Sequence, residues 1–234
     1  SYNPTSWVFV HDRDADRNGV FDEVGTSNIT NFPVSIGNRG GNLGQVLHAS
    51  ISGNARFVAM GVYDAPRLEE DLYYLTGRSQ YTHYVPSGNV WLRDLDTDVD
   101  GVLNELGAVS TEVASRGPDG SYAYDVSTQG SACSRQVPIV RNDGTVLFEC
   151  THDGELSRSL GLPRWANAQY YVRQGLTDIT LVSRGDDGTI STESTARPPV
   201  ALATDSPYAV WHTPVSLDPA DTANRDVYRT QFEP

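Results

Sequence analysis

Two acidic segments of the chain, residues 14–23 and 96–105, have the residue types and spacing to bind a hard cation. In each segment, oxygen-bearing side chains occupy alternate positions, and a glycine (Gly19 or Gly101) follows the third of them. Calcium takes six to eight oxygen ligands from loops of this kind. The glycine permits the sharp bend that lets the side chains converge. The spacing therefore predicts two calcium loops of one design.

The predicted ligands follow the calcium-loop pattern at its positions 1, 3, 5, 7 and 9, where position 7 contributes a main-chain carbonyl. An acidic residue comes directly after position 9 in both loops. The candidate ligands are Asp14, Asp16, Asn18, Val20, Asp22 and Glu23 in the first loop, and Asp96, Asp98, Asp100, Val102, Asn104 and Glu105 in the second. The alternative is a pair of solvated acidic turns that hold no ion.

Both loops depart from a helix–loop–helix calcium site at position 12, where the usual glutamate is replaced by Gly25 and Gly107. Glu23 and Glu105, or a water molecule, would complete the coordination. Predicted strands, rather than helices, precede the loops. This arrangement favours two structural Ca²⁺ ions over a sensor that opens on binding.

Each loop is part of an internal repeat, because residues 7–23 and 89–105 superimpose without gaps. A degenerate third copy of the opening strand starts at Gln169 and lacks the acidic loop, and a further opening strand covers about residues 226–232. Strands that end in glycine turns, and then hairpins with tight polar turns, follow each opening strand. The repeats lie near residues 7–62, 89–152 and 167–214.

This recurrence predicts one all-β domain over residues 1–234, built from propeller-type four-stranded blades. About three repeats and the start of a fourth are present. A β-sandwich built from duplicated hairpins is the alternative architecture.

The hairpins and opening strands resemble the TolB-type, WD-like β-propeller repeat family, which is common in secreted bacterial proteins. Its Ser-x-x-Gly-Arg-(Phe/Tyr)-Val-Ala-Phe hairpin is similar to residues 52–60 and 142–148, and its Asp-Val-Phe-Val-Arg-Asp strand to residues 7–12, 90–94 and 226–229. The resemblance implies a propeller, but family members have six or more blades. Three blades cannot close a ring, so the chain would be part of a longer protein, pair with another copy, or form an open β-stack.

Composition narrows the class of partner. The formal net charge is −13, and an acidic surface of this kind repels nucleic acid and anionic lipid. No stretch approaches 18 consecutive apolar residues, so no membrane span is expected. The chain starts at Ser1 without a signal-like segment, which is typical of a mature or excised product. We expect a secreted, extracellular or cell-surface location, with the periplasm as an alternative.

Two cysteines, Cys133 and Cys150, flank a turn-like segment at residues 141–144. A hairpin about that turn would place them nearly opposite each other on paired strands, where a disulfide could form. Two buried free thiols are the alternative.

The sequence thus favours a calcium-stabilised binding or structural module that contacts another protein, copies of itself, or a polysaccharide. No catalytic residues are predicted. The competing class is a propeller-type enzyme, such as a glycan hydrolase or lyase, or its non-catalytic fragment.

Overall fold

A computed structural model describes most of the chain. It covers residues 6–22, 30–38, 40–64, 88–120, 123, 133, 136–150, 154–162, 168–175, 178–184, 190, 201–213 and 226–232. The described part is an all-β fold with one short helix, α2 (Gly154–Ser159). Among the described residues, no helix has the length and apolar character needed to cross a membrane.

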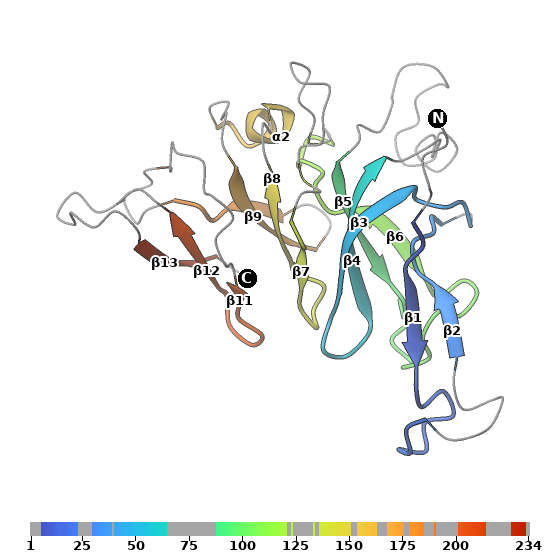
Figure 1. The fold of residues 1–234 in the computed structure, drawn as a ribbon. Helices are drawn as coiled ribbons and strands as arrows, with labels where there is room; N and C mark the ends of the chain where they lie inside the picture. Colours follow the sequence, from blue (N-terminus) through green and yellow to red (C-terminus); the bar gives the residue numbers. More distant parts are fainter. Residues whose placement is uncertain are drawn as a thin grey trace.

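The strands form four antiparallel sheets within the described residues (Figure 1). A two-stranded sheet pairs β1 (Phe9–Asp12) with β2 (Thr30–Pro33). A four-stranded sheet has the order β3 (Gln45–Ile51), β4 (Phe57–Asp64), β5 (Asn89–Asp94) and β6 (Ser110–Val113).

The second four-stranded sheet has the order β10 (Asp178–Leu181), β9 (Gln169–Gln174), β8 (Val146–Cys150) and β7 (Ile139–Val140). A three-stranded sheet contains β11 (Ala201–Leu202), β12 (Tyr208–Thr213) and β13 (Asp226–Gln231). Within each sheet, strands that pair are consecutive in the chain, so the three larger sheets are meanders.

The sheets are out of phase with the sequence repeats. A repeat contributes four strands, as in β1 to β4, but its last two strands join the first two of the next repeat in one sheet. The four strands of one repeat therefore belong to two sheets. This corrects the expectation from the sequence that the four strands of a repeat form one blade. This offset between repeats and sheets arises because the last strand of each hairpin pairs with the opening strand that follows it in the chain, β4 with β5 and β8 with β9.

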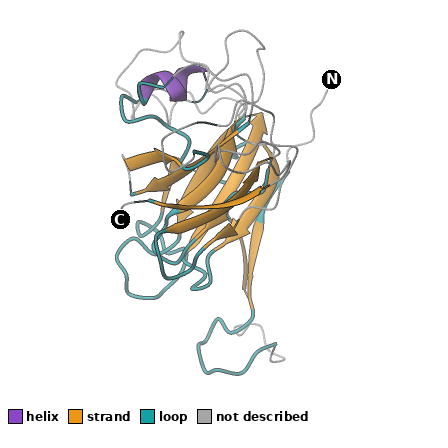
Figure 2. Ribbon diagram, turned by 90° about the vertical axis from the view of Figure 1, so that its left-hand side faces the viewer, coloured by secondary structure: helices purple, strands orange, loops and turns teal. Residues whose placement is uncertain are grey.

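Successive sheets lie side by side in the described structure, as the two ribbon views show (Figure 1 and Figure 2). Apolar side chains fill the spaces between the sheets. One core cluster joins β1–β2 to β3–β6 and includes Val34, Met60 and Trp91. A second joins β3–β6 to β7–β10, and a third joins β7–β10 to β11–β13. Because the two middle sheets are covered on both faces, β5, β8 and β9 are almost continuously buried.

One hydrogen-bond motif recurs where each opening strand meets the segment after its partner strand. A serine hydroxyl accepts a main-chain N–H bond from the opening strand at 3.0 Å, and the N–H of the residue before the serine donates back to the same strand residue. The strand residue and serine are Val8 and Ser35, Val90 and Ser115, and Tyr170 and Ser183. The same hydrogen bonds therefore occur at one point in each of these three copies and identify equivalent positions.

Cys133 and Cys150 form a disulfide, as predicted. The geometry differs from the prediction, because β7 covers only Ile139–Val140 and Cys133 lies outside it. The N–H of Cys133 instead donates to the carbonyl of Gly88, directly before β5, whereas Cys150 ends β8. The disulfide therefore links the end of β8 to Cys133, which is hydrogen-bonded to the residue before β5 of the other four-stranded sheet, and both cysteines belong to the core cluster that the two sheets share.

Candidate metal centre

The loop that follows β5 folds around the carboxylate of Asp96, which is buried to 5% exposure. The N–H groups of Asp100 and Gly101 donate to its two oxygens at 3.1 and 3.0 Å. The loop can turn this tightly because Val99 and Gly101 have φ values of 62° and 86°. Glycine adopts this conformation without strain, whereas valine does so at a cost. The sequence therefore folds a compact loop with its first carboxylate at the centre.

Three carboxylates converge in this loop. One oxygen each from Asp96, Asp98 and Asp100 lies within 4.8 Å of the others. Asp98 and Asp100 are exposed, so solvent can reach the cluster. Like charges at this separation repel each other, and a divalent cation between them would convert the repulsion into attraction.

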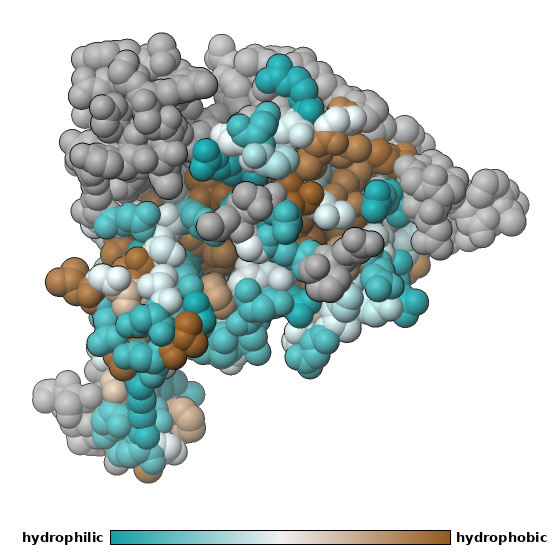
Figure 3. Space-filling view, turned by 180° about the vertical axis from the view of Figure 1, so that it is seen from behind, coloured by the Kyte–Doolittle hydropathy of each residue, from teal (hydrophilic) through white to brown (hydrophobic). Residues whose placement is uncertain are grey.

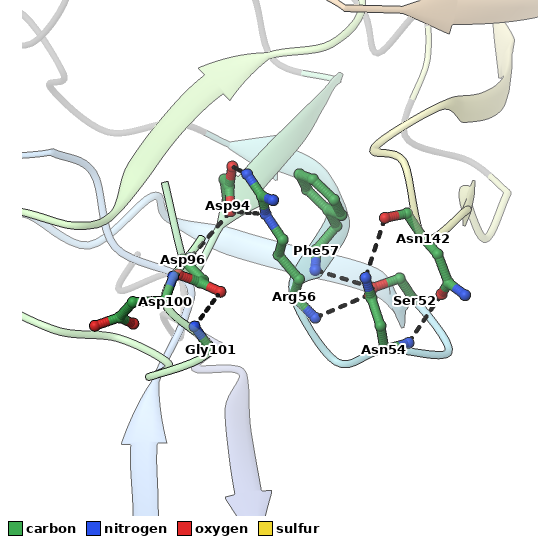
Figure 4. A network of polar contacts seen from close by, with 9 residues as sticks. All are labelled: Ser52, Asn54, Arg56, Phe57, Asp94, Asp96, Asp100, Gly101 and Asn142. Carbon is green, nitrogen blue, oxygen red and sulfur yellow. Dashed lines mark hydrogen bonds and ion pairs between the residues drawn. The ribbon is translucent and has the colours of Figure 1, made fainter. Parts of the chain in front are cut away.

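The strand end is held in place by an ion pair across two strands (Figure 4). Arg56 Nε and Nη2, at the start of β4, donate to the two carboxylate oxygens of Asp94 at 2.8 and 2.7 Å. Asp94 Oδ1 also accepts the N–H of Asp96 at 3.0 Å. Asp94 therefore connects the hairpin of one repeat to the first residue of the acidic loop in the next repeat.

We predict that Arg56→Ala lowers the free energy of unfolding by about 1 to 2 kcal/mol, because a largely buried bidentate pair would be lost. Urea denaturation measures the change. Arg13→Ala is the matched control: Arg13 also pairs with an aspartate, Asp22, but both side chains are about half exposed, at 55% and 49%. No measurable loss is expected for the control, because exposed pairs are screened by water. Equal losses in the two variants would contradict the role of Asp94 as an anchor.

The loop that follows β1 repeats the same design. The N–H groups of Asn18 and Gly19 donate to the two oxygens of Asp14 at 3.0 Å each. Positive φ values recur at the equivalent positions, 58° at Arg17 and 84° at Gly19. The side-chain amide of Asn18 donates to Asp16 at 3.0 Å, so the first three predicted ligands of this loop also lie together.

Some predicted ligands are engaged elsewhere. Arg13 holds the carboxylate of Asp22 in a bidentate ion pair, and this hydrogen bonding lowers the pKa of Asp22. The side-chain oxygen of Asn104 accepts a bond from Arg93 at 3.2 Å. The position-9 residue of each loop is thus bound to an arginine in this structure. Glu23 lies outside the described residues.

Glu105 lies within the electrostatic influence of the acidic cluster. Partial burial raises its pKa first, and the negative charges of Asp100, Asp98 and Asp96 raise it further. Arg17, from the other loop, opposes this shift. Glu105 therefore shares the negative potential of the three aspartates.

The two loops are neighbours in space, a relation that their positions in the sequence do not indicate. The position that a Cβ atom would take at Gly101 is 3.7 Å from Nη1 of Arg17. Arg13, Arg17, Arg56 and Arg93 all border the loops, and none of them was predicted. Arg13 and Arg17 stand where the second loop has Leu95 and Val99, so this difference between the aligned copies was the available signal.

No family model, no curated protein and no solved structure shows a significant match to this chain. Carboxylate and amide oxygens are hard ligands that suit calcium or magnesium better than the softer transition metals.

Proposed function

We propose that this protein is an extracellular, calcium-stabilised β-repeat module of propeller type that makes contacts with other proteins or with copies of itself. The observation that carries the proposal is the occurrence of two acidic loops with the same internal hydrogen bonds after equivalent strands. One loop alone would be an acidic turn. Two loops of the same backbone conformation argue for a shared role.

The charge balance of the second loop supports a bound cation. Asp96, Asp98 and Asp100 converge. The pKa of Glu105 is raised by desolvation first and then by the negative charges of these aspartates. A divalent ion would relieve this repulsion and replace it with direct coordination. Because both loops directly follow strands, the ions would stabilise the ends of β1 and β5 rather than drive a conformational switch.

Two features support the location and the architecture. A disulfide persists in oxidising compartments, which agrees with a protein that acts outside the cytoplasm. The succession of meander sheets with apolar cores between them agrees with a TolB-type, WD-like propeller arrangement, in which further sheets would complete the ring. A polysaccharide remains a second class of ligand for such a surface.

Calcium should raise the melting temperature of the chelator-treated protein. At a free concentration 100 times the dissociation constant, each site would add about 2.7 kcal/mol to the free energy of unfolding. For a chain of this length, that corresponds to a shift of about 5 to 10 °C per site. Differential scanning calorimetry in EGTA and in calcium measures the shift, and magnesium at the same concentration tests selectivity.

Single substitutions assign the ions to the loops. Asp16→Ala and Asp98→Ala should each reduce the bound calcium by about one ion per chain, measured by metal analysis after gel filtration. Asp205→Ala is the control, because Asp205 is an exposed aspartate in the β11–β12 turn, away from both loops. An unchanged melting curve in EGTA and full calcium content in both loop variants would refute the calcium proposal.

A further inference from the structure

The first and last sheets of the described structure each have one face that no described sheet covers. The face of β1 that points away from β3–β6 carries Trp7, Phe9 and His11, and we call it the N-face. Figure 3 shows apolar surface at the left edge of the molecule, where β1 and β2 lie. The opposite face of the last sheet, the C-face, carries Tyr208, Val210, Val227 and Arg229 on β12 and β13.

The N-face is exposed although its equivalents elsewhere in the chain are buried. The recurring serine motif makes Val8, Val90 and Tyr170 equivalent, so the next residues, Phe9, Trp91 and Tyr171, are equivalent as well. Trp91 is 2% exposed and Tyr171 is fully buried, but Phe9 is 58% exposed. In the two later copies, the preceding sheet covers this position.

The C-face shows the same contrast. Phe57 pairs with Asp94 in β4–β5, and Tyr208 pairs with Gln231 in β12–β13, so Val90 and Val227 occupy equivalent positions. Val90 is fully buried against the next sheet, whereas Val227 is 72% exposed. Both ends of the described stack therefore present apolar side chains at positions that the inner copies bury.

We propose that the C-face of one copy of this chain packs on the N-face of a second copy, head to tail. This contact continues the internal interface between β3–β6 and β7–β10, in which Phe57 and Val90 of one sheet meet Tyr171 of the next. The inference rests on the proposed self-assembly function and names its surface and its occupant. It does not depend on calcium.

A second copy is the occupant that the geometry favours, because the internal interface joins two different faces and the chain carries both of them. A contact between two N-faces would have no counterpart within the chain.

The charged residue of the C-face also complements the aromatic residues of the N-face. Arg229 lies over the ring of Tyr208 at 4.5 Å from its centroid, so its guanidinium would meet Trp7 and Phe9, whose faces attract cations. Such a heterologous contact extends into a ring or an open chain.

Sedimentation velocity over a range of protein concentrations tests the contact with two variants, Phe9→Arg on the N-face and Val227→Arg on the C-face. Both positions are exposed, so both variants should fold. Each variant should weaken self-association at least about tenfold, because each removes one side of the apolar contact. An equimolar mixture should form a heterodimer, since Phe9→Arg retains its C-face and Val227→Arg retains its N-face. The heterodimer cannot grow, because its two altered faces both carry an added arginine and repel each other.

Leu47→Glu is the control, because Leu47 is 40% exposed on β3, in a sheet that takes no part in the contact. Three results would each overturn the proposal. The wild-type chain could remain monomeric, or only Phe9→Arg could act with no rescue in the mixture, which would indicate an N-face pair. A loss of melting temperature in Phe9→Arg without a change of mass would show that the chain covers its own N-face. In all three cases the calcium-dependent melting shift would remain an independent test.

Discussion

Replacing both Cys133 and Cys150 with alanine should lower the free energy of unfolding by about 3 kcal/mol. The disulfide closes a loop with a sequence separation of 17 residues, and the chain-entropy model assigns about 3 kcal/mol to a loop of this size. Both cysteines are buried, at 1% and 0% exposure, so the smaller alanine side chains would also loosen the core. For a chain of this length, the melting temperature should fall by about 6 to 12 °C.

The position of the disulfide makes this effect specific. It ties the end of β8 to Cys133, which is hydrogen-bonded to the residue before β5, so its loss should loosen the contact between the two four-stranded sheets. Hydrogen exchange should therefore accelerate in β5 and β8 before it does in β12 and β13. Reductant is the control: it should lower the melting temperature of the wild type but leave the double variant unchanged. Equal melting temperatures for the oxidised and reduced wild type would contradict the prediction.

Arg173→Met should destabilise the protein by about 2 to 4 kcal/mol, because it removes a buried arginine that connects two sheets. Arg173 is on β9 and is 3% exposed. Its Nη1 donates to the main-chain carbonyls of Val113 and Ala114 in the preceding sheet, the latter at 3.0 Å. Methionine fills similar space but cannot supply these bonds.

A substitution of the partner carboxylate, Glu112, distinguishes the contribution of the ion pair from the contribution of the hydrogen bonds that Arg173 donates. Glu112 lies 3.5 Å from Arg173, yet burial raises the pKa of Glu112 and lowers the pKa of Arg173. Burial thus outweighs the attraction between the two charges. Glu112→Gln should therefore cost much less than Arg173→Met, and the double variant should recover part of the loss by removing an unpaired carboxylate. Denaturant unfolding of the four proteins measures the cycle, and equal losses in the two single variants would contradict this account.

The position that Arg173 occupies on β9 is occupied by arginine, threonine or histidine on the other opening strands. Arg93 is equivalent to Arg173 and donates to the carbonyl of Ile36 and the hydroxyl of Thr111 at 3.1 and 2.7 Å. At the equivalent place on β13, Thr230 donates its hydroxyl to the carbonyl of Val182 at 2.8 Å. In each case a buried polar side chain on an opening strand donates to a main-chain carbonyl just after the last strand of the preceding sheet. On β1 this position is His11, which is exposed, in agreement with an uncovered N-face.

The sequence by itself determined the features that depend on neighbours in the chain. The all-β class, the hairpin turns and the two acidic loops follow from short-range patterns, because turn conformation and the convergence of alternate side chains are set within about ten residues. Asp96, Asp98 and Asp100 could therefore be grouped from their spacing alone. The cysteine pair was also anticipated, although the hairpin geometry assumed for it was wrong.

The tertiary structure alone decided how these pieces combine. The two-strand offset between repeats and sheets depends on which strand β4 and β8 pair with, and that pairing is not visible in either repeat alone. The same holds for Arg56 with Asp94, which are 38 residues apart, and for the approach of Arg17 to Gly101. Long-range contacts depend on which surfaces become buried when the sheets pack, whereas a local sequence pattern indicates only the conformation that one segment prefers.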